Sequence, residues 1–446
     1  MNRRKFLESS SKAILISSVL PINSFAGLSK GNKKTKVALV GTGTRGIRTW
    51  GKYLLEGYGK WVDMVGLCDI NYKRLKFAKK YINTNAKTYV AKDFDLMVKE
   101  TKPDYVIVTT TDSFHVDYIV RAMELGVNVI SEKPIATEKD QCQRILDTEN
   151  KTGKKVTIGF NFRFFNESME IKKIIDSGIL GNILSINFEE YLDRSHGASY
   201  YRRWHGKIKY SGSLLIHKAS HHFDVVNWWL DSDPVDVQAM GKVAFYGHNH
   251  SFRGRNCRTC PFTDKCKYYW DMTKDDYLMN LYGKCEDIDG YYRDGCVWDN
   301  EIDSYDTSTV QVNYENGTLL TYTMNTNLPY EGQYISITGE KARLDVRLLN
   351  RQPWEVEAPI HIRITEDMKT TKEYNLHRDT GGHGGADGRV KDLIFKPGVK
   401  DVLQGRAGSR AGVIASLMGV AARESIETGG RIKIKDMVDF KTYWKG

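Results

Sequence analysis

The chain has 446 residues, of which 41% are apolar and 27% charged, and its formal net charge is +11. This length and apolar content exclude a disordered chain and predict two domains. The positive charge is spread without a long run of lysine or arginine and matches no nucleic-acid-binding module, which argues against a nucleic-acid partner.

The first 26 residues differ from the rest of the chain. They read MNRRKFLESSSKAILISSVLPINSFA and carry four cations against one anion, a net +3, so the remaining residues carry +8. The basic start, modest apolar stretch and small-residue exit resemble a twin-arginine export signal, with a frayed basic terminus as the plain alternative. The apolar stretch is too short and too rich in serine for a membrane span. We therefore expect a protein that is periplasmic or otherwise exported, with a signal at 1–26 and a linker at 27–35.

A glycine-rich turn follows the linker, in KVALVGTGTRG (36–46). Gly41, Gly43 and Gly46 form G-x-G-x-x-G directly after an expected strand, the pattern of a dinucleotide-binding turn. Glycines there let the backbone and the next helix N-terminus approach a pyrophosphate, and Thr44 and Arg45 lie in the same turn. The alternative is an α/β domain whose glycines only make turns.

The next expected strand ends in an acid. WVDMVGLCD (61–69) closes on Asp69, where a carboxylate can bind a ribose diol and disfavour a 2′-phosphate. NAD is therefore the expected cofactor, while Lys73 and Arg74 leave NADP open.

Strands and helices continue to alternate after this acid. Strands at 103–111, 126–136 and 154–164, with helices from about His115 and Lys139, predict a doubly wound parallel sheet for a domain at 36–160. We expect Thr110 and His115, at the carboxyl end of one strand, to contact the cofactor.

A polar segment, YLDRSHGASYYRRWHGKIKYSG (191–212), combines aromatic rings with forked cationic donors. Aromatic faces cover the C–H faces of sugars and guanidinium groups bind hydroxyls, which predicts substrate contacts. The candidates are Tyr201, Arg203, Trp204 and His205. A solvated basic loop is the alternative.

Histidines and an aspartate interrupt an apolar segment, SGSLLIHKASHHFDVVNWWL (211–230). His217, His221 and Asp224 stand at i, i+4 and i+7, so on one helix all three would share a face and address a ligand. Satisfied buried histidines are one alternative. A metal site with Asp224 as third ligand is another, although nicotinamide chemistry needs no metal, and we expect none in the active site.

The remainder, 161–446, predicts an α+β domain with long strands. The Asn316-Gly317 pair indicates a hairpin within an antiparallel sheet, and a last helix at about 410–428 is expected to pack back onto the first domain. A loop with five glycines around His383, in DTGGHGGADGR, is expected to close over substrate, with a flexible surface loop as the alternative.

Five cysteines crowd into an insertion at about 247–304. An exported protein would use them as disulfides, which we favour, whereas Cys257, Cys260 and Cys266 also suit a structural zinc or iron–sulfur centre. The other two of the five are Cys285 and Cys296.

Three segments together resemble one enzyme family. SEKPIA (131–136), GFNFRF (159–164) and the histidine segment, within a match from about Lys36 to the C-terminus, resemble the Gfo/Idh/MocA oxidoreductases. The resemblance implies a Rossmann domain followed by an α+β domain with a large, mostly antiparallel sheet, whose outer face commonly forms a homo-oligomer.

The resemblance also implies roles for single residues. Lys133 would lie beside the nicotinamide and the substrate hydroxyl, with Glu132 next to it, and Arg163 would lie near the substrate. His221 takes the place of the family's proton acceptor. His217 stands where the family has an aspartate, a departure that leaves its part in the proton relay open and gives it an orienting or binding role.

The expected function is an NAD(P)-dependent dehydrogenase that transfers hydride from a sugar or glycoside hydroxyl carbon, such as a glucoside 3-dehydrogenase, with a tightly bound cofactor. An NAD-dependent, redox-neutral glycoside hydrolase on the same fold is the first alternative. A non-catalytic sugar-binding sensor is the second, because His217 replaces the usual aspartate.

Overall fold

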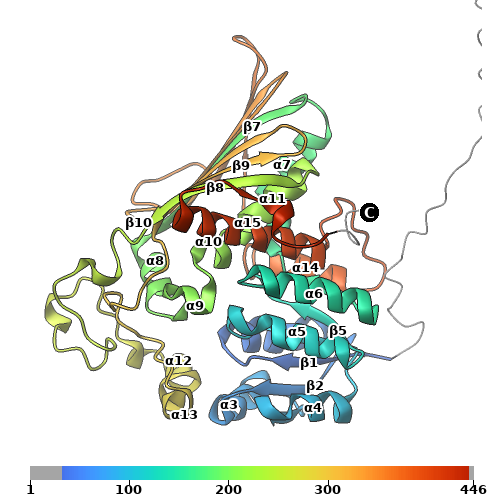
Figure 1. Ribbon diagram of the computed structural model, residues 1–446, viewed down its shortest axis with the longest axis vertical. Helices are drawn as coiled ribbons and strands as arrows, with labels where there is room; N and C mark the ends of the chain where they lie inside the picture. Colours follow the sequence, from blue (N-terminus) through green and yellow to red (C-terminus); the bar gives the residue numbers. More distant parts are fainter. Residues whose placement is uncertain (1–32, 441–446) are drawn as a thin grey trace, which may run out of the picture. The chain divides into compact units, whose positions relative to one another are not determined.

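A parallel sheet in the first part of the chain is built from short apolar strands. In residues 33–440, which this computed structural model describes, it has the strand order β15-β6-β5-β4-β1-β2-β3 (Figure 1). All its neighbouring strands run parallel except β15, which pairs antiparallel with β6. The strands are β1 (Thr35–Val40), β2 (Val62–Asp69), β3 (Lys87–Val90), β4 (Tyr105–Val108), β5 (Asn128–Ser131), β6 (Val156–Ile158) and β15 (Ala407–Gly408). The predicted doubly wound sheet is confirmed.

Amphipathic helices cover this sheet. In α5 the apolar residues Val116, Ile119, Val120 and Met123 recur three or four positions apart and are all buried, because that spacing gathers them on one face. The helical segments are η1 (Gly46–Lys52), α2 (Tyr53–Tyr58), α3 (Tyr72–Ile82), α4 (Phe94–Thr101), α5 (His115–Glu124) and α6 (Lys139–Thr152). The expected export signal at 1–26 and most of the expected linker lie outside the described residues.

The second sheet is long and mostly antiparallel, as predicted. Its order in the described residues is β14-β13-β12-β11-β7-β10-β9-β8-β16, and only the β7–β10 pair is parallel. A hairpin with Gly317 at a φ of 84° joins β9 to β10 at the predicted turn. The strands are β7 (Ile183–Asp193), β8 (Pro234–Lys242), β9 (Thr307–Tyr314), β10 (Leu319–Leu328), β11 (Glu331–Gly339), β12 (Arg343–Arg351), β13 (Ile360–Thr365), β14 (Thr371–Leu376) and β16 (Ile432–Lys433).

The histidine segment forms two helices, so the prediction of one continuous helix is wrong. α10 (Leu214–His217) ends at His217 and α11 (Ser220–Leu230) begins three residues later. At the break the His221 amide donates to the Lys218 carbonyl, 3.4 Å away, and the His217 carbonyl accepts from the Lys133 ammonium instead. A partner distant in sequence therefore ends the helix. Three further helices precede α10 in this part of the chain: α7 (Asn166–Asp176), α8 (Arg194–Tyr201) and α9 (Ile208–Ser211).

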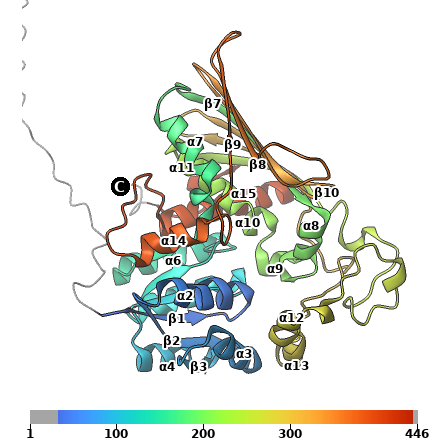
Figure 2. The same ribbon diagram turned by 180° about the vertical axis from the view of Figure 1, so that it is seen from behind.

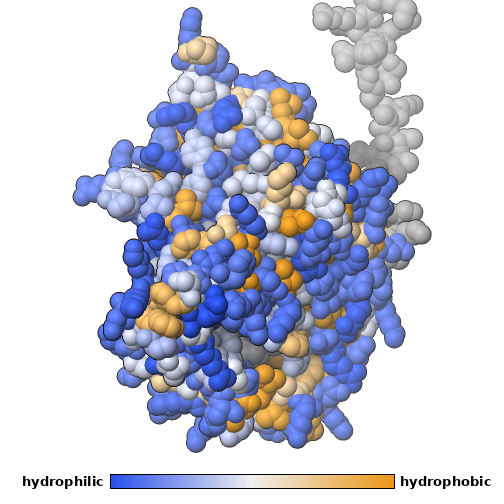
Figure 3. Space-filling model, turned by 60° about the vertical axis from the view of Figure 1, so that its left-hand side comes forward, coloured by the Kyte–Doolittle hydropathy of each residue, from blue (hydrophilic) through white to orange (hydrophobic). Residues whose placement is uncertain are grey.

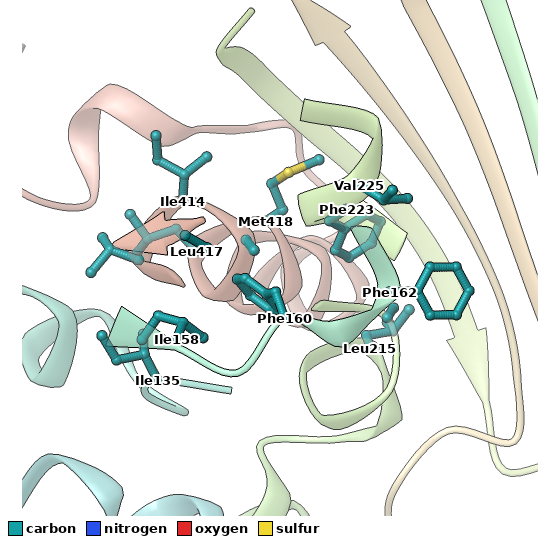
Figure 4. Close-up of a cluster of buried hydrophobic side chains, with 14 of the residues drawn as sticks. Ile135, Ile158, Phe160, Phe162, Leu215, Phe223, Val225, Ile414, Leu417 and Met418 are labelled. Atoms are coloured by element: carbon teal, nitrogen blue, oxygen red, sulfur yellow. The ribbon is translucent and has the colours of Figure 1, made fainter. Parts of the chain in front are cut away.

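Helix α15 (Ser409–Thr428), predicted at 410–428, is buried between the two sheets (Figures 1 and 2). Figure 4 shows its side chains Leu417 and Met418 facing the apolar cluster formed by Ile158, Phe160 and Phe223. The helix approaches α10 so closely that a Cβ at Gly419 would lie 2.6 Å from the Leu215 carbonyl oxygen. α15 therefore sets the position of the histidine segment against the parallel sheet. A shorter helix, α14 (Ala386–Phe395), lies nearby in the sequence.

The insertion (residues 247–304) has little regular structure beyond two short helices, α12 (Asp276–Leu281) and α13 (Glu286–Asp289). All seven cysteines are free thiols, so the expected disulfides do not form. No group of three or more His, Cys, Asp or Glu side chains in residues 33–440 is placed to hold a metal ion, which also corrects the suggested metal centre at Cys257, Cys260 and Cys266. Charge pairs hold the insertion instead, with Arg258 contacting both Asp294 and Glu286.

None of the helices in the described part of the chain is long and apolar enough to cross a membrane.

We expect Gly419→Ala to destabilise the protein by about 1–3 kcal/mol, because its Cβ would overlap the Leu215 backbone and force α15 away from α10. The matched control is Gly57→Ala in α2, where a Cβ meets nothing within 4 Å and alanine favours the helix. Chemical denaturation of both variants measures the difference. Equal stability of the two would contradict the close packing.

Candidate active site

A cavity of about 1790 Å³ opens where the glycine-rich turn, the carboxyl ends of the parallel strands, the histidine segment and the insertion meet. Figure 3 looks onto the side of the insertion, where a recess in the lower half of the face is bordered by hydrophilic side chains. Most predicted site residues line the cavity: Gly41, Gly43, Thr44, Arg45, Asp69, Thr110, His115, Glu132, Lys133, Arg203, Trp204, His205, His217, His221 and His383. Four do not line it: Gly46, Arg163, Tyr201 and Asp224.

The glycine-rich turn is shaped as a cradle for a dinucleotide. Gly41 has a φ of 88°, and a Cβ there would lie 2.6 Å from the Thr109 backbone. A Cβ at Gly46 would lie 2.2 Å from the Gly41 carbonyl oxygen, so only glycine lets η1 begin this close to β1. The residues present therefore fit a bound dinucleotide, with its pyrophosphate at the turn.

Asp69 lies at the end of β2, where the ribose-binding acid was predicted. Its buried carboxylate accepts hydrogen bonds from the Thr42 amide at 2.6 Å and from the Arg74 guanidinium at 3.1 Å. Arg74 also pairs with Asp289 of the insertion, at 2.5 Å. Because two carboxylates already neutralise Arg74, this cation is not free for a 2′-phosphate, which favours NAD over NADP.

The insertion reaches over the turn at a second point. The Tyr282 hydroxyl accepts a hydrogen bond of 2.9 Å from the Thr44 amide and lies 3.2 Å from the Thr44 hydroxyl. The Cys285 carbonyl accepts one of 2.8 Å from the Asn71 amide group. The insertion therefore contacts both the pyrophosphate end and the ribose end of the cradle.

Lys133 extends from the carboxyl end of β5 to the end of α10. Its ammonium donates to the His217 carbonyl, and the preceding Glu132 carboxylate accepts from Arg45 and from the Trp50 indole, each at 2.6 Å. Burial lowers the pKa of Lys133 to about 8, although the carboxylates of Asp112 and Glu132 oppose the shift. Lys133 is thus an ammonium at neutral pH that can lose its proton under mildly basic conditions.

His217, at the end of α10, forms a dyad with an acid from the first domain. Its Nδ1 lies 2.6 Å from the Asp112 carboxylate, in the turn that follows β4. Burial raises the pKa of Asp112 well above its usual value and lowers that of His217 well below its own. Both shifts disfavour an ionised Asp112 carboxylate beside a protonated His217 imidazolium. The carboxyl and the imidazole therefore share one proton through their hydrogen bond.

His221 lines the cavity between two phenylalanines. Its ring lies 5.8 Å from Phe160 and 5.7 Å from Phe162, and its Nδ1 is buried without a hydrogen-bond partner. Burial, together with the nearby cations Lys133 and Lys218, lowers its pKa well below the usual value. The imidazole is therefore neutral at physiological pH, the form that accepts a proton.

Arg163 and Asp224, both predicted substrate contacts, pair with each other below the cavity surface. Two hydrogen bonds of 2.7 and 2.6 Å join the guanidinium to the carboxylate, and both residues are buried. The break between α10 and α11 turns Asp224 toward this partner, away from the face of His217. Tyr201 is buried as well, stacked on Tyr246 with its hydroxyl on the Tyr305 carbonyl. These three residues support the cavity wall.

Aromatic rings form the wall beside His217. Trp204 stacks on His205, which lies edge-on to His217 at a centroid distance of 4.2 Å. Tyr200 lies edge-on to His217 at 5.6 Å. Flat apolar surface next to ionisable groups is suited to a sugar ring.

His383 lies at the mouth of the cavity, on the predicted glycine-rich loop. Its Nδ1 is 2.8 Å from Asp387, which also receives two hydrogen bonds of 3.0 Å from Arg45. The His383 side chain is half exposed. The loop is thus joined to the glycine-rich turn through Asp387 and Arg45.

His115 lies at the base of the site. Its two ring nitrogens face the Pro134 and Thr110 carbonyl oxygens at 2.7 and 3.2 Å.

Among the residues at the site that were missed from sequence are Asp112, Tyr282 and Asp289. Asp112 had a usable signal, since it follows a parallel strand, and the carboxyl ends of such strands share the edge where ligands bind. The other two lie in an insertion whose sequence gives no indication of where it folds.

A dinucleotide cradle beside a cavity with ionisable groups defines a class, the NAD-binding oxidoreductases. The chain belongs to the Gfo/Idh/MocA oxidoreductase family. The family's NAD-binding Rossmann-fold model matches residues 35–160, and the model of its C-terminal alpha/beta domain matches residues 172–434.

Named relatives agree with this assignment. The Bacillus subtilis (strain 168) protein YteT, named as an oxidoreductase, is 33% identical over 430 residues, covering 90% of this chain and 98% of its own. D-glucoside 3-dehydrogenase of Escherichia coli (strain K12) is 29% identical over 149 residues, 33% of this chain and 41% of that enzyme. The crystal structure of aldose-aldose oxidoreductase from Caulobacter crescentus has the same fold, with a TM-score of 0.61 at 15% identity, covering 90% of this chain and all of that one.

We expect Asp289→Ala to release NAD faster and to bind NADP more tightly than the wild type, because it loosens the insertion and frees Arg74. Stopped-flow displacement of bound NADH and titration with NADP measure both effects. Asp287→Ala is the matched control, since its pair with Lys73 is exposed and contributes little. Identical behaviour of the two variants would mean that the insertion does not retain the cofactor.

We expect Arg163→Met to lose about 3–5 kcal/mol of stability, because it leaves the Asp224 carboxylate buried and unpaired. The double variant Arg163→Met with Asp224→Leu removes both charges and should recover most of the loss. Denaturant titrations of the single and double variants give the coupling. A double variant no more stable than the single one would argue against an ion pair in this position.

Proposed function

We propose that this protein is an NAD-dependent dehydrogenase that oxidises a hydroxyl-bearing carbon of a sugar or glycoside. One observation carries the proposal: Lys133, His221 and the Asp112–His217 dyad line the same cavity as the glycine-rich turn. A proton acceptor, a cation and a dinucleotide cradle around one space are what hydroxyl oxidation needs.

Each side chain has a part in this chemistry. When bound, the nicotinamide supplies the hydride acceptor. His221, neutral and with one ring nitrogen buried, takes the hydroxyl proton at the other. The Lys133 ammonium donates a hydrogen bond to the substrate oxygen and stabilises the negative charge that develops on it. His217, held by Asp112, orients the substrate through the ring edge that faces the cavity.

Two facts support a carbohydrate substrate. The wall next to His217 is aromatic, with Trp204 and Tyr200 adjacent to the imidazole rings. Among the partial-length relatives, one is named D-glucoside 3-dehydrogenase and another, from Salmonella typhimurium, inositol 2-dehydrogenase, which is 31% identical over 173 residues and 48% of its length.

A redox-neutral glycoside hydrolase remains the second candidate, because the contacts of the insertion favour a cofactor that stays bound between turnovers. Purified protein incubated with excess NAD and a panel of glycosides separates the two. A dehydrogenase gives one NADH for each sugar oxidised, and a hydrolase releases the aglycone without net NADH. A protein that binds NAD but converts no sugar would contradict both.

We expect kcat/KM for hydroxyl oxidation to fall as pH rises through about 8, since Lys133 then loses the proton that makes it an ammonium. Lys133→Met should reduce kcat by about 10²–10⁴-fold. It should also abolish this fall in kcat/KM at alkaline pH, the alkaline limb of the pH profile. Lys133→Arg keeps a charge at that pH and should retain part of the activity without the limb. A limb at the same pH in Lys133→Met would assign the titration to another group.

A further inference from the structure

Two arginines face the cavity without an anionic partner. Arg203 follows α8 and Arg293 lies in the insertion, both line the cavity, and each is partly buried. Among residues 33–440 neither forms an ion pair with a carboxylate. Arg203 donates only from Nε, to the Ser199 carbonyl at 2.6 Å, and the Arg293 guanidinium lies 5.4 Å from the Trp270 ring centroid.

Most other arginine and lysine side chains around the cavity are either paired with a carboxylate or exposed to solvent. Arg45, Arg74, Lys207 and Lys218, which also line the cavity, each have a carboxylate within 3.2 Å. Cavity arginines that lack one, such as Arg255, are exposed and therefore solvated. Partly buried arginines of like charge are stable only with an anion nearby. Asp112 is near enough for Arg203 to lower its pKa, but its carboxylate is already bound to His217, and no carboxylate forms an ion pair with either arginine in residues 33–440.

The pKa shifts of the groups around Arg203 also fit an excess of positive charge in this part of the cavity. Burial, with the repulsion from Arg293, lowers the pKa of Arg203 to about 10. Both arginines also depress the pKa of His205, after burial as the main cause, so the three groups lie in one electrostatic neighbourhood. An anion bound between the guanidinium groups would relieve this repulsion.

The position of Arg203 places that anion beside the reacting groups. Its guanidinium lies 5.1 Å from the centroid of Tyr200, whose ring lies 5.6 Å from that of His217. The cradle already offers its own donors to a pyrophosphate, at the turn carrying Thr44. We propose that the substrate is an acidic sugar, a uronate or uronoside, whose carboxylate is bound by Arg203 and Arg293. This inference rests on the proposed function and names its substrate class.

Binding calorimetry on the NAD-loaded protein tests the proposal with matched pairs of methyl glycosides: glucuronide against glucoside and galacturonide against galactoside. At least one uronoside should bind about ten- to a hundredfold more tightly than its neutral partner. Arg203→Met and Arg293→Met should each remove most of that preference. Arg203→Lys should keep part of it, and the exposed Arg255→Met, the matched control, should keep all of it.

The other outcomes overturn the proposal in distinguishable ways. Equal binding of neutral and acidic sugars would remove the substrate class and leave the oxidation of hydroxyls standing. Loss of NAD affinity in Arg203→Met or Arg293→Met, with the uronoside preference intact, would assign the arginines to the dinucleotide phosphates. Tighter binding of glucose 6-sulfate than of the uronosides would assign them to a sulfate. Failure of every sugar to bind or react would contradict the proposed function itself.

Discussion

The buried ammonium of Lys133 is the constraint on which the arrangement of the site depends. A cation removed from water needs an acceptor, and Lys133 finds it in the His217 carbonyl. That carbonyl is available because α10 ends there, where a continuous helix would have used it for the His221 amide. The same break turns α11, which sends Asp224 to Arg163 and leaves His221 on the cavity wall. The need of the buried Lys133 ammonium for an acceptor is thus linked to the arrangement of the histidine segment, in which His221 faces the cavity and Asp224 supports the cavity wall.

Sequence predicted the parts of the site that depend on local signals. Gly41, Gly43 and Asp69 act through turns and strand ends, so a short window of residues is enough to place them. The helix break could not be predicted, because its cause, Lys133, lies 84 positions upstream. Asp112 needed only the rule that parallel strands share a ligand-binding edge. For Tyr282 and Asp289 no rule was available, because the position of an insertion is set by tertiary contacts and its cysteines suggested bonds that do not form.

Charge compensation changes across the cavity. At the dinucleotide end both arginines are matched by carboxylates: Asp69 and Asp289 neutralise Arg74, and Glu132 and Asp387 neutralise Arg45. Such pairs hold together the side chains around the cradle. Beside Tyr200 the balance is positive, because Arg203 and Arg293 have no carboxylate. Arg203 and Arg293 have no such partner, so this difference in charge separates the cofactor end of the cavity from the proposed substrate end.

The dyad explains how His217 can stand where the family has an aspartate. An acid on α10 would have placed its negative charge on the same helix as His221. Here the acid comes instead from Asp112, in the turn after β4, and its hydrogen bond to the imidazole connects it to the cavity. The dyad then depends on the position of α10, since a shift of this helix would separate the imidazole from its acid. Close packing of α15 at Gly419 against the backbone of Leu215 and Ile216 opposes that shift, so this contact outside the cavity supports the position of His217 inside it.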